Sequence, residues 1–341
     1  MQNIAFSRHL FKPYYTCRRK GLRLSGSFCP NLTVRNLDSS LIGESAAILT
    51  SCFWTCSSIL FTSAGRRFGS FSVNAYRTIM AIGLLILAHV VLLGTLLPLA
   101  SSGQWFWMGV SGIVGLGIGD FGLFAAYVTI GPRRSVLIQS SAPIFASLGA
   151  YWMLGETFSL LSILGIAVTL TGIAVVLLEN EEKSKEKLAA KNRKAWGVFF
   201  GLISAMGQGF GVVLSKKGMY LDVSVAMNPL SAALIRMMLA GLFIWTCALF
   251  AGKLSDLHRA VKDTVGIKYT AAGALVGPFV GMTLSMVAVA DTQAGIAQTL
   301  MSLMPVLIIP VVWIIYRERT SWRGILGAAV AIIGVAILFL A

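Results

Sequence analysis

The chain has 341 residues, of which 56% are hydrophobic and only 12% are charged. Soluble domains carry about 25% charged residues, so this composition, with a mean hydropathy of +0.79, excludes a soluble protein and indicates one embedded in a lipid bilayer. The net charge of +15 is not arranged as a basic stripe, which excludes nucleic acid as a partner.

The chain begins with a basic tail, residues 1–36, which contains seven Lys and Arg and no acidic residue. The tail lacks the clean apolar core of a signal peptide and has the composition of a transit peptide, so we predict a disordered tail or a presequence. The rest divides into two apolar halves, 37–178 and 196–341. A charged linker, 179–195, joins them as a solvated, partly helical bridge.

Ten apolar stretches follow the tail, five in each half. Each has about the 20 residues that cross roughly 30 Å of hydrocarbon. Little chain is left for loops, so a soluble catalytic domain has no room. The expected spans are 42–63, 73–97, 105–128, 135–153, 159–178, 196–215, 229–250, 267–289, 294–316 and 322–341.

The second half repeats the first. Pro143 precedes Glu156 by thirteen residues, as Pro305 precedes Glu318. Duplicated sets of spans are typical of secondary transporters. Further matches pair Gly165–Gly172 with Gly327–Gly334, Arg77 with Arg236, and Gly115 and Gly119 with Gly273 and Gly277, which puts Pro278 opposite Asp120.

The basic residues predict how the spans are oriented. Loops 1, 3, 5, 7 and 9 hold 17 of the 28 Lys and Arg, and the even loops hold only Lys216 and Lys217. Basic loops stay in the cytoplasm, so we expect the odd loops there. Five spans per half is an odd number, and we therefore predict an all-α integral membrane fold of ten transmembrane helices in two inverted five-helix repeats. The basic tail favours the opposite orientation unless it is a presequence.

The doubled Pro-to-Glu stretch, the Arg near the start of each second span and the glycine-rich fifth spans resemble the EamA family of the drug/metabolite transporter superfamily. The resemblance covers about residues 43–178 and 196–341. It implies a ten-helix permease whose helices 3, 4, 8 and 9 surround a substrate cavity, and it favours amino acids or related metabolites, often moved outward. The second repeat departs from the pattern, because Tyr316-Arg317-Glu318 stands where the first has Leu-Gly-Glu.

Asp120 is the most suggestive functional residue. It lies in the third span with no opposite charge at helical spacing, and a lone carboxylate at membrane depth costs on the order of 2.5–3.5 kcal/mol on insertion scales. It is therefore a candidate for proton coupling or for substrate binding. The alternative is a carboxyl group that is hydrogen-bonded to nearby glycine backbone and serves structure only.

Other polar side chains within the spans are weaker candidates. Arg77 and Arg236 favour snorkelling to the interface, with binding of an anionic substrate group as the alternative. Glu44 is expected at the interface, in the first turn of its helix, with a role in the cavity as the alternative. Glu156 and Glu318 are expected to set helix ends. Side chains that could orient a substrate, or equally hydrogen-bond between helices, are Trp54, Tyr127, Gln139, Gln208 and Gln298.

Small residues and prolines predict close packing and bends. Glycines spaced by four, Gly115 with Gly119 and Gly273 with Gly277, form faces that let helices approach closely. Prolines inside spans free backbone carbonyls and are candidate hinges for alternating access. These are Pro143, Pro278, Pro305 and Pro310.

The sequence thus predicts a gradient-driven permease for a small molecule in the plasma (inner) membrane, with protons as a candidate coupling ion. The three histidines are scattered and no phosphate-binding loop occurs, so we expect no enzyme activity, no cofactor and no metal. Two alternatives stay open. One is a membrane scaffold or sensor that has lost transport, and the other is a sugar-phosphate or nucleotide-sugar exchanger.

Overall fold

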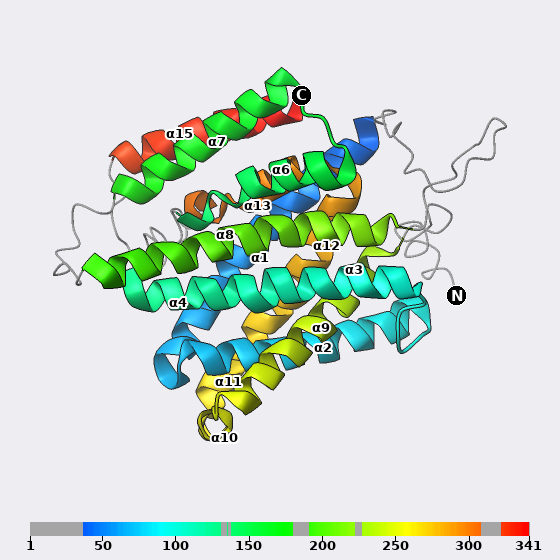
Figure 1. The fold of residues 1–341 in the computed structure, drawn as a ribbon, viewed down its shortest axis with the longest axis vertical. Coiled ribbons are helices and arrows are strands. Elements are labelled where there is room, and N and C mark those ends of the chain that lie inside the picture. Colours follow the sequence, from blue (N-terminus) through cyan, green and yellow to red (C-terminus); the bar gives the residue numbers. More distant parts are fainter. Residues whose placement is uncertain are drawn as a thin grey trace, which may run out of the picture.

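The computed structural model describes residues 37–130, 135, 138–179, 191–221, 227–307 and 322–340. The predicted tail and residues 180–190 of the linker lie outside this part. Every regular element within it is helical (Figure 1). The first half forms α1 (Leu37–Phe68), α2 (Ser70–Leu93), α3 (Ser102–Gly112), η1 (Ile113–Gly119), α4 (Asp120–Ile130), α6 (Ala142–Leu154) and α7 (Leu160–Glu179).

The second half forms a matching series of helices. It comprises α8 (Lys191–Met219), α9 (Pro229–Phe250), α10 (Leu254–Val261), α11 (Thr264–Ala274), η3 (Leu275–Gly281), α12 (Met282–Asp291), α13 (Ala294–Met301) and α15 (Trp322–Phe339). The short amphipathic α10 was not predicted; it lies in the polar loop before the eighth span.

Seven helical segments of the described chain are long and apolar enough to cross a membrane. They are Ser40–Phe68, Phe71–Leu93, Ser102–Leu123, Ala195–Met219, Pro229–Phe250, Thr264–Asp291 and Trp322–Phe339. Three shorter apolar helices, Ala142–Leu154, Leu160–Val175 and Ala294–Leu307, lie where the fourth, fifth and ninth spans were expected. The chain is therefore an integral membrane protein.

Local sequence explains where several helices begin and end. Ser101 caps α3 in a reciprocal capping box with Gln104, which satisfies backbone N–H groups that the first turn leaves free. Asn228 caps α9, and Pro229 follows at its first position. Gly94 ends α2 with a left-handed φ of 72°. The second span is consequently shorter than its predicted limit at residue 97.

The first helix of each half packs against the other half. α1 contacts α11, η3, α12 and α13, whereas α8 contacts α3, η1, α4 and α6. Each half thus inserts one helix into its partner, and the interior lies where these two helices meet the third and fourth spans.

Glycines make these crossings close. On one side, Trp54, Ser57 and Phe61 of α1 lie against Gly281, Gly277 and Gly273 respectively. On the other, the glycines of α8 meet those of η1 backbone to backbone. A Cβ on Gly207 would lie 2.8 Å from the Gly119 Cα, and one on Gly211 would lie 2.9 Å from the Gly115 Cα. Only residues without a side chain allow this approach.

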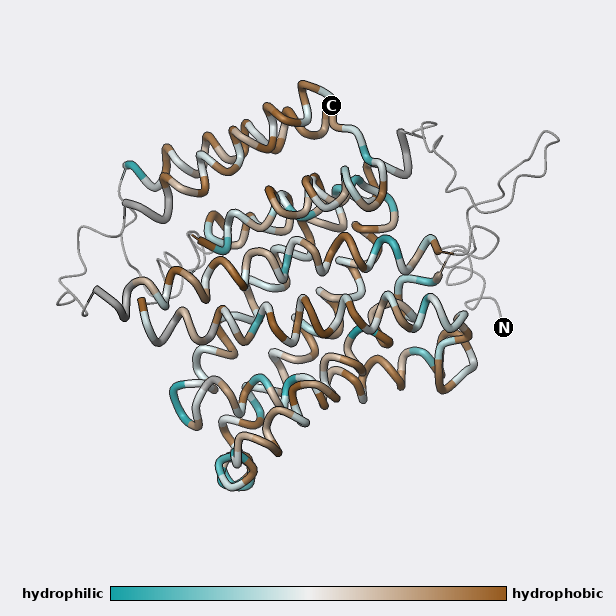
Figure 2. Tube along the Cα trace, in the orientation of Figure 1, coloured by the Kyte–Doolittle hydropathy of each residue, from teal (hydrophilic) through white to brown (hydrophobic). Residues whose placement is uncertain are grey.

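The helices α7 and α15 form a separate pair at the edge of the bundle (Figure 1). The matched segments of the two halves meet in this pair: Gly165 and Gly172 face α15, and Gly334 faces the Thr169 backbone. Figure 2 shows apolar residues along most of both helices, as expected for surfaces that meet lipid.

The third spans contain a π-helical segment at the same place in each half. η1 begins at residue 113 and η3 at residue 275, which is the 162-residue spacing that also separates Pro143 from Pro305. This spacing pairs Gly115 with Gly277, and Asp120 with Met282. The predicted pairing of Gly115 with Gly273, and of Asp120 with Pro278, is therefore wrong by one helical turn.

The fourth spans are interrupted rather than bent. Turns at Ser140–Ser141 and at Ser302–Leu303 divide them, again 162 residues apart. The expectation that Pro143 and Pro305 lie inside continuous helices is wrong, because each stands in the first turn after the interruption. The N–H that proline lacks would have no helical partner there. Pro278 does lie inside a helix, η3, and Pro310 lies outside the described residues.

Candidate functional site

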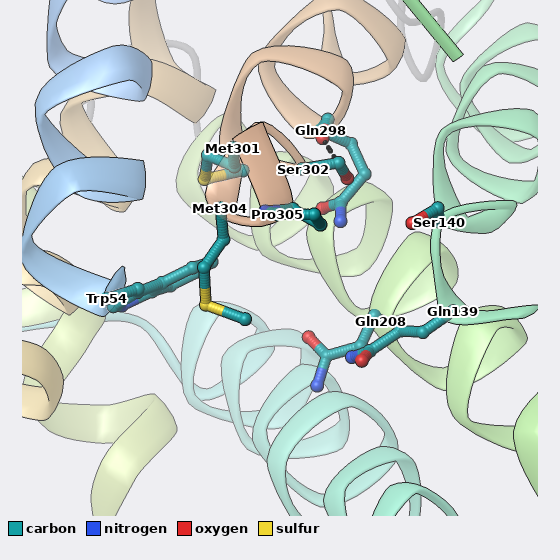
Figure 3. Close-up of a pocket in the computed structure, with 9 residues that line it drawn as sticks. All are labelled: Trp54, Gln139, Ser140, Gln208, Gln298, Met301, Ser302, Met304 and Pro305. Atoms are coloured by element: carbon teal, nitrogen blue, oxygen red, sulfur yellow. Dashed lines mark hydrogen bonds between the residues drawn. The ribbon is translucent and has the colours of Figure 1, made fainter. Parts of the chain in front are cut away.

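A pocket opens at the two interruptions. Its cavity volume is about 80 Å³, and the pocket is open to solvent on one side. Figure 3 shows Trp54 on one side, Gln139 and Gln208 on the other, and the Gln298 amide directed into the space between them. Both halves contribute to the wall, and the described lining residues are Trp54, Gln139, Ser140, Gln208, Gln298, Met301, Ser302, Met304 and Pro305.

Gln208 links this pocket to Asp120. Its Nε2 donates to Asp120 Oδ1 at 2.9 Å and to the Gly115 carbonyl at 3.1 Å. A backbone carbonyl and an ionised carboxylate can only accept hydrogen bonds. The Gln208 amide must therefore turn its nitrogen, and not its oxygen, toward these two groups. The glutamine is thereby fixed, with its carbonyl oxygen left for the pocket side (Figure 3).

The interpretation of Asp120 as an unpaired acid is wrong. Arg77 of α2 forms an ion pair with Asp120 Oδ2, and Arg77 Nε donates to Asn74 Oδ1 at 2.8 Å. The guanidinium also lies over the Phe61 ring, 5.4 Å from its centroid. Arg77 therefore points inward instead of snorkelling. Sequence spacing along one helix could not reveal this, because the partner lies 43 residues away.

Arg236 does not snorkel either. It is only 3% exposed, and its guanidinium lies against Gly115 and Gly211. A Cβ added to Gly115 would lie 2.7 Å from Arg236 Nη2, and one added to Gly211 would lie 3.2 Å from it. Its Nε has no hydrogen-bond partner among the described residues. Arg77 and Arg236 are each the eighth residue of their helices, and they approach the same π-helical segment from opposite halves.

The remaining predicted site residues fall into three groups. Trp54, Gln139 and Gln298 line the pocket, and the predicted glycines form the helix crossings described above. The side chain of Tyr127 lies outside the described residues, as does Glu318. Glu44 is 1% exposed and accepts a hydrogen bond from Ser40.

Several lining residues were missed. Ser140 and Ser302 occupy equivalent positions in the two interrupted spans. The 162-residue spacing of the Pro-to-Glu stretches would have paired them, but only the observation that both spans break there shows that they face the pocket.

One end of the pocket region is tied together by Lys216 at the C-terminal part of α8. Its Nζ lies 2.6 Å from Glu156 Oε1 and donates to the Thr292 carbonyl at 2.6 Å. Glu156 Oε2 accepts from the Ala294 backbone N–H at 2.9 Å. This cluster, the Lys216 tie, joins the end of α6 to the ends of α8 and α12 and the start of α13. Glu156 thus binds the first backbone N–H of a helix, as expected of a residue at a helix end, but that helix is α13 of the other half.

The opposite end carries an exposed ion pair. Arg67 Nε, at the end of α1, lies 2.6 Å from Asp263 Oδ2, ahead of α11. The hydrogen bond from Arg67, with one from the Gly266 backbone, holds the pKa of the Asp263 carboxyl below its usual value. A lowered carboxyl pKa stabilises the fold above the unfolded pKa, and the contribution is lost only as pH falls through the folded value. It is therefore constant near neutrality.

Comparison with known proteins identifies the family. The sequence profile of the EamA-like transporter family matches residues 41–178 and 195–340, one match for each half. The chain belongs to the EamA-like transporter family. This EamA-like protein has no match among curated proteins. A solved structure, described only as the crystal structure of a protein, superposes with a TM-score of 0.69 at 16% identity, over 89% of this chain and 96% of the other. At that identity the likeness concerns the fold.

Proposed function

We propose that this EamA-like protein is a gradient-driven transporter that moves a small metabolite by alternating access. The observation that carries the proposal is the pocket, which lies where two interrupted spans, one from each half, break at equivalent positions. Discontinuous helices at a repeat interface are the usual place for a transported substrate. The two repeats are inverted in this proposal, with the odd loops cytoplasmic and the protein in the plasma (inner) membrane.

The Lys216 tie supports alternating access. It closes the end of the bundle where α6, α8, α12 and α13 meet, through an ion pair and two backbone hydrogen bonds. An ion pair between two halves is a contact that can open and re-form without unfolding either one. We propose that this end opens when the pocket exchanges substrate with the non-cytoplasmic side.

Asp120 remains the proposed coupling residue. It would act through the partners that its charge holds, and not as an unpaired acid. Its charge holds Arg77 and the Gln208 amide in place. A proton on Asp120 would weaken both contacts and so change the pocket wall, which keeps protons as the candidate coupling ion. Arg236 is the nearest cation to an anionic group that enters beside Gly115.

The cargo that the family resemblance favours is an amino acid or a related compound, moved outward. A sugar phosphate or nucleotide sugar is less well supported, because the described pocket wall contains no Lys or Arg to meet a phosphate. A scaffold or sensor would keep the pocket but move nothing through it.

Flux through reconstituted protein tests the proposal. Purified protein in liposomes should exchange radiolabelled substrate with an imposed gradient, tested with amino acids, amides, nucleobases and sugar phosphates. Empty liposomes give the leak. Binding of a compound without flux would favour the sensor, and flux that saturates with concentration establishes the transporter.

A further inference from the structure

The pocket wall is polar but carries no ionisable side chain among the described residues. It presents three carboxamides, Gln139, Gln208 and Gln298, two hydroxyl groups, Ser140 and Ser302, and an apolar part made by Trp54, Met301, Met304 and Pro305. A charged group that leaves water for such a wall loses its hydration without gaining a counter-charge. The wall therefore favours a ligand that is uncharged where it lies in the pocket.

The nearest charges stand behind this wall and are directed elsewhere. Asp120 is bound by Arg77 and by Gln208. Arg236 lies against Gly115 and Gly211, at the crossing of η1 and α8, and is not part of the described lining. Gln208 stands between Asp120 and the pocket, so a ligand meets an amide before it meets the carboxylate.

Gln208 fixes one part of the ligand's hydrogen-bond pattern. Both of its N–H bonds are used by Asp120 Oδ1 and the Gly115 carbonyl. Its carbonyl oxygen is left as an acceptor, and the neighbouring carboxylate prevents the amide from turning over. The ligand must therefore bring an N–H donor to this position.

Gln298 provides the complementary group. The residue as a whole is only 7% exposed, but its amide is directed into the pocket (Figure 3). The amide atoms are not among the buried polar atoms without a partner and have no hydrogen bond among the described residues, so they are open to a ligand in the pocket. Gln139 is half-buried and lies across the pocket, and its amide also has no hydrogen bond among the described residues. Either can donate an N–H to a ligand carbonyl.

We propose that the pocket binds an uncharged compound with an amide or lactam edge, an N–H beside a C=O, on a small flat ring. The N–H donates to the Gln208 carbonyl oxygen, the C=O accepts from Gln298 or Gln139, and the ring lies among Trp54, Met301 and Met304. This inference rests on the proposed transport function and narrows its cargo to uncharged relatives of amino acids and to lactam heterocycles.

Matched pairs of compounds test the charge requirement. Nicotinamide carries an amide where nicotinate carries a carboxylate, and orotate is uracil with an added carboxylate. Binding to the purified full-length protein is measured by isothermal titration, and uptake by the same protein in liposomes. We expect at least one uncharged member to bind about tenfold or more tightly than its carboxylate partner, since a buried charge without a partner is strongly penalised.

Variants test the named contacts. Gln298→Met removes the unpartnered amide at similar volume, and Gln208→Leu removes the fixed acceptor. Each should weaken binding of the uncharged compound about five- to tenfold, the effect of one lost hydrogen bond. Gln104→Met is the matched control, because Gln104 caps α3 and is not in the described pocket wall, and it should keep the wild-type affinity. If Gln208→Leu fails to fold, the affinity of Gln298→Met alone tests whether the pocket glutamines bind the ligand.

Three outcomes would overturn the inference. One is equal or tighter binding of nicotinate and orotate. Another is uptake of leucine or glutamate with no binding of any amide, which would leave the transporter standing and reject only this cargo. The third is no binding and no flux with any compound tested, which would contradict both proposals.

Discussion

Two arginines and one amide surround Asp120. Arg77 and Gln208 bind the carboxylate from α2 and α8, and Arg236 lies beside Gly115, whose carbonyl also accepts from Gln208. The carboxylate thus balances one arginine and positions the amide that lines the pocket. In a low-dielectric interior, removing one member of such a set costs more than the pair itself contributes, because the other charge is left without a partner.

Asp120→Asn should therefore destabilise the protein. We expect a loss of about 3–5 kcal/mol, the range for breaking one side of a buried ion pair, seen as a lower thermal midpoint in detergent. The double variant Arg77→Met with Asp120→Leu should recover a large part of the loss, because it removes both charges. If Asp120→Asn and the wild type melt at the same temperature, the Arg77–Asp120 ion pair does not contribute to the stability of the fold.

The same variant tests coupling. If a proton on Asp120 releases Arg77 and Gln208 during transport, the pH dependence of flux should flatten in Asp120→Asn, which cannot titrate. An unchanged pH profile in an active Asp120→Asn protein would reject Asp120 as the coupling residue and leave its positioning role.

The crossings of helices depend on glycines that no larger residue can replace. In Gly207→Ala the new Cβ would meet the Gly119 Cα and the Val114 carbonyl, each at 2.8 Å. Both contacts are backbone, so relief requires the helices to separate. We expect a loss of about 1–3 kcal/mol, the usual cost of overpacking, measured as a lower thermal midpoint.

Gly83→Ala is the control for this substitution. Gly83 lies within α2 with nothing within 4 Å of an added Cβ, so the change should be neutral or slightly stabilising through helix propensity. Equal destabilisation by both substitutions would mean that close approach at η1 is not what Gly207 provides.

Hydropathy located the helices well, because about 20 apolar residues in sequence are the direct consequence of crossing the bilayer. The predicted span 229–250 coincides with α9. Hydropathy did not predict where helices are interrupted or change their hydrogen-bond pattern. An apolar run containing Pro143 does not show whether the proline bends a helix or begins one. The two π-helical segments are as apolar as the α-helices beside them, so hydropathy does not distinguish them. The pairing of the repeats was off by one turn in the third spans for the same reason, since several glycine spacings fit equally well.

The site was predictable only residue by residue. Polar side chains within spans are rare and costly, and this placed Trp54, Gln139 and Gln298 among the candidates before any contact was known. Their partners could not be predicted, because the contacts join distant segments. Gln208 reaches Asp120 across 88 positions, and Lys216 reaches the Thr292 carbonyl across 76.

At the scale of the whole molecule, the two halves are interlocked by α1 and α8, and the pocket lies between their interrupted spans. The Lys216 tie joins the halves at one end, and the Arg67–Asp263 pair lies at the C-terminal end of α1. The two contacts differ in exposure: side-chain exposure is 16% and 12% for Lys216 and Glu156, against 45% and 24% for Arg67 and Asp263. Exposed pairs contribute little to stability, so the Lys216 tie is the contact whose loss should change access to the pocket.

Charge reversal tests this directly. Lys216→Glu sets two carboxylates against each other at Glu156 and removes the donor to Thr292, so the end held by the tie should open. A cysteine at Ser302, which lines the pocket, reports access in a background without the five native cysteines. We expect a membrane-impermeant thiol reagent applied from the Lys216 side to label it about tenfold faster, since breaking one side of a buried pair costs several kcal/mol.

The neighbouring lysine and the reversed pair complete the test. Lys217 lies over the Trp107 ring, 4.0 Å from its centroid, and takes no part in the tie, so Lys217→Glu should leave the labelling rate unchanged. Lys216→Glu with Glu156→Lys restores opposite charges and should slow labelling again. If the double reversal labels as fast as Lys216→Glu alone, the ion pair does not hold this end closed, and the backbone contacts of Glu156 and Thr292 must account for the closure.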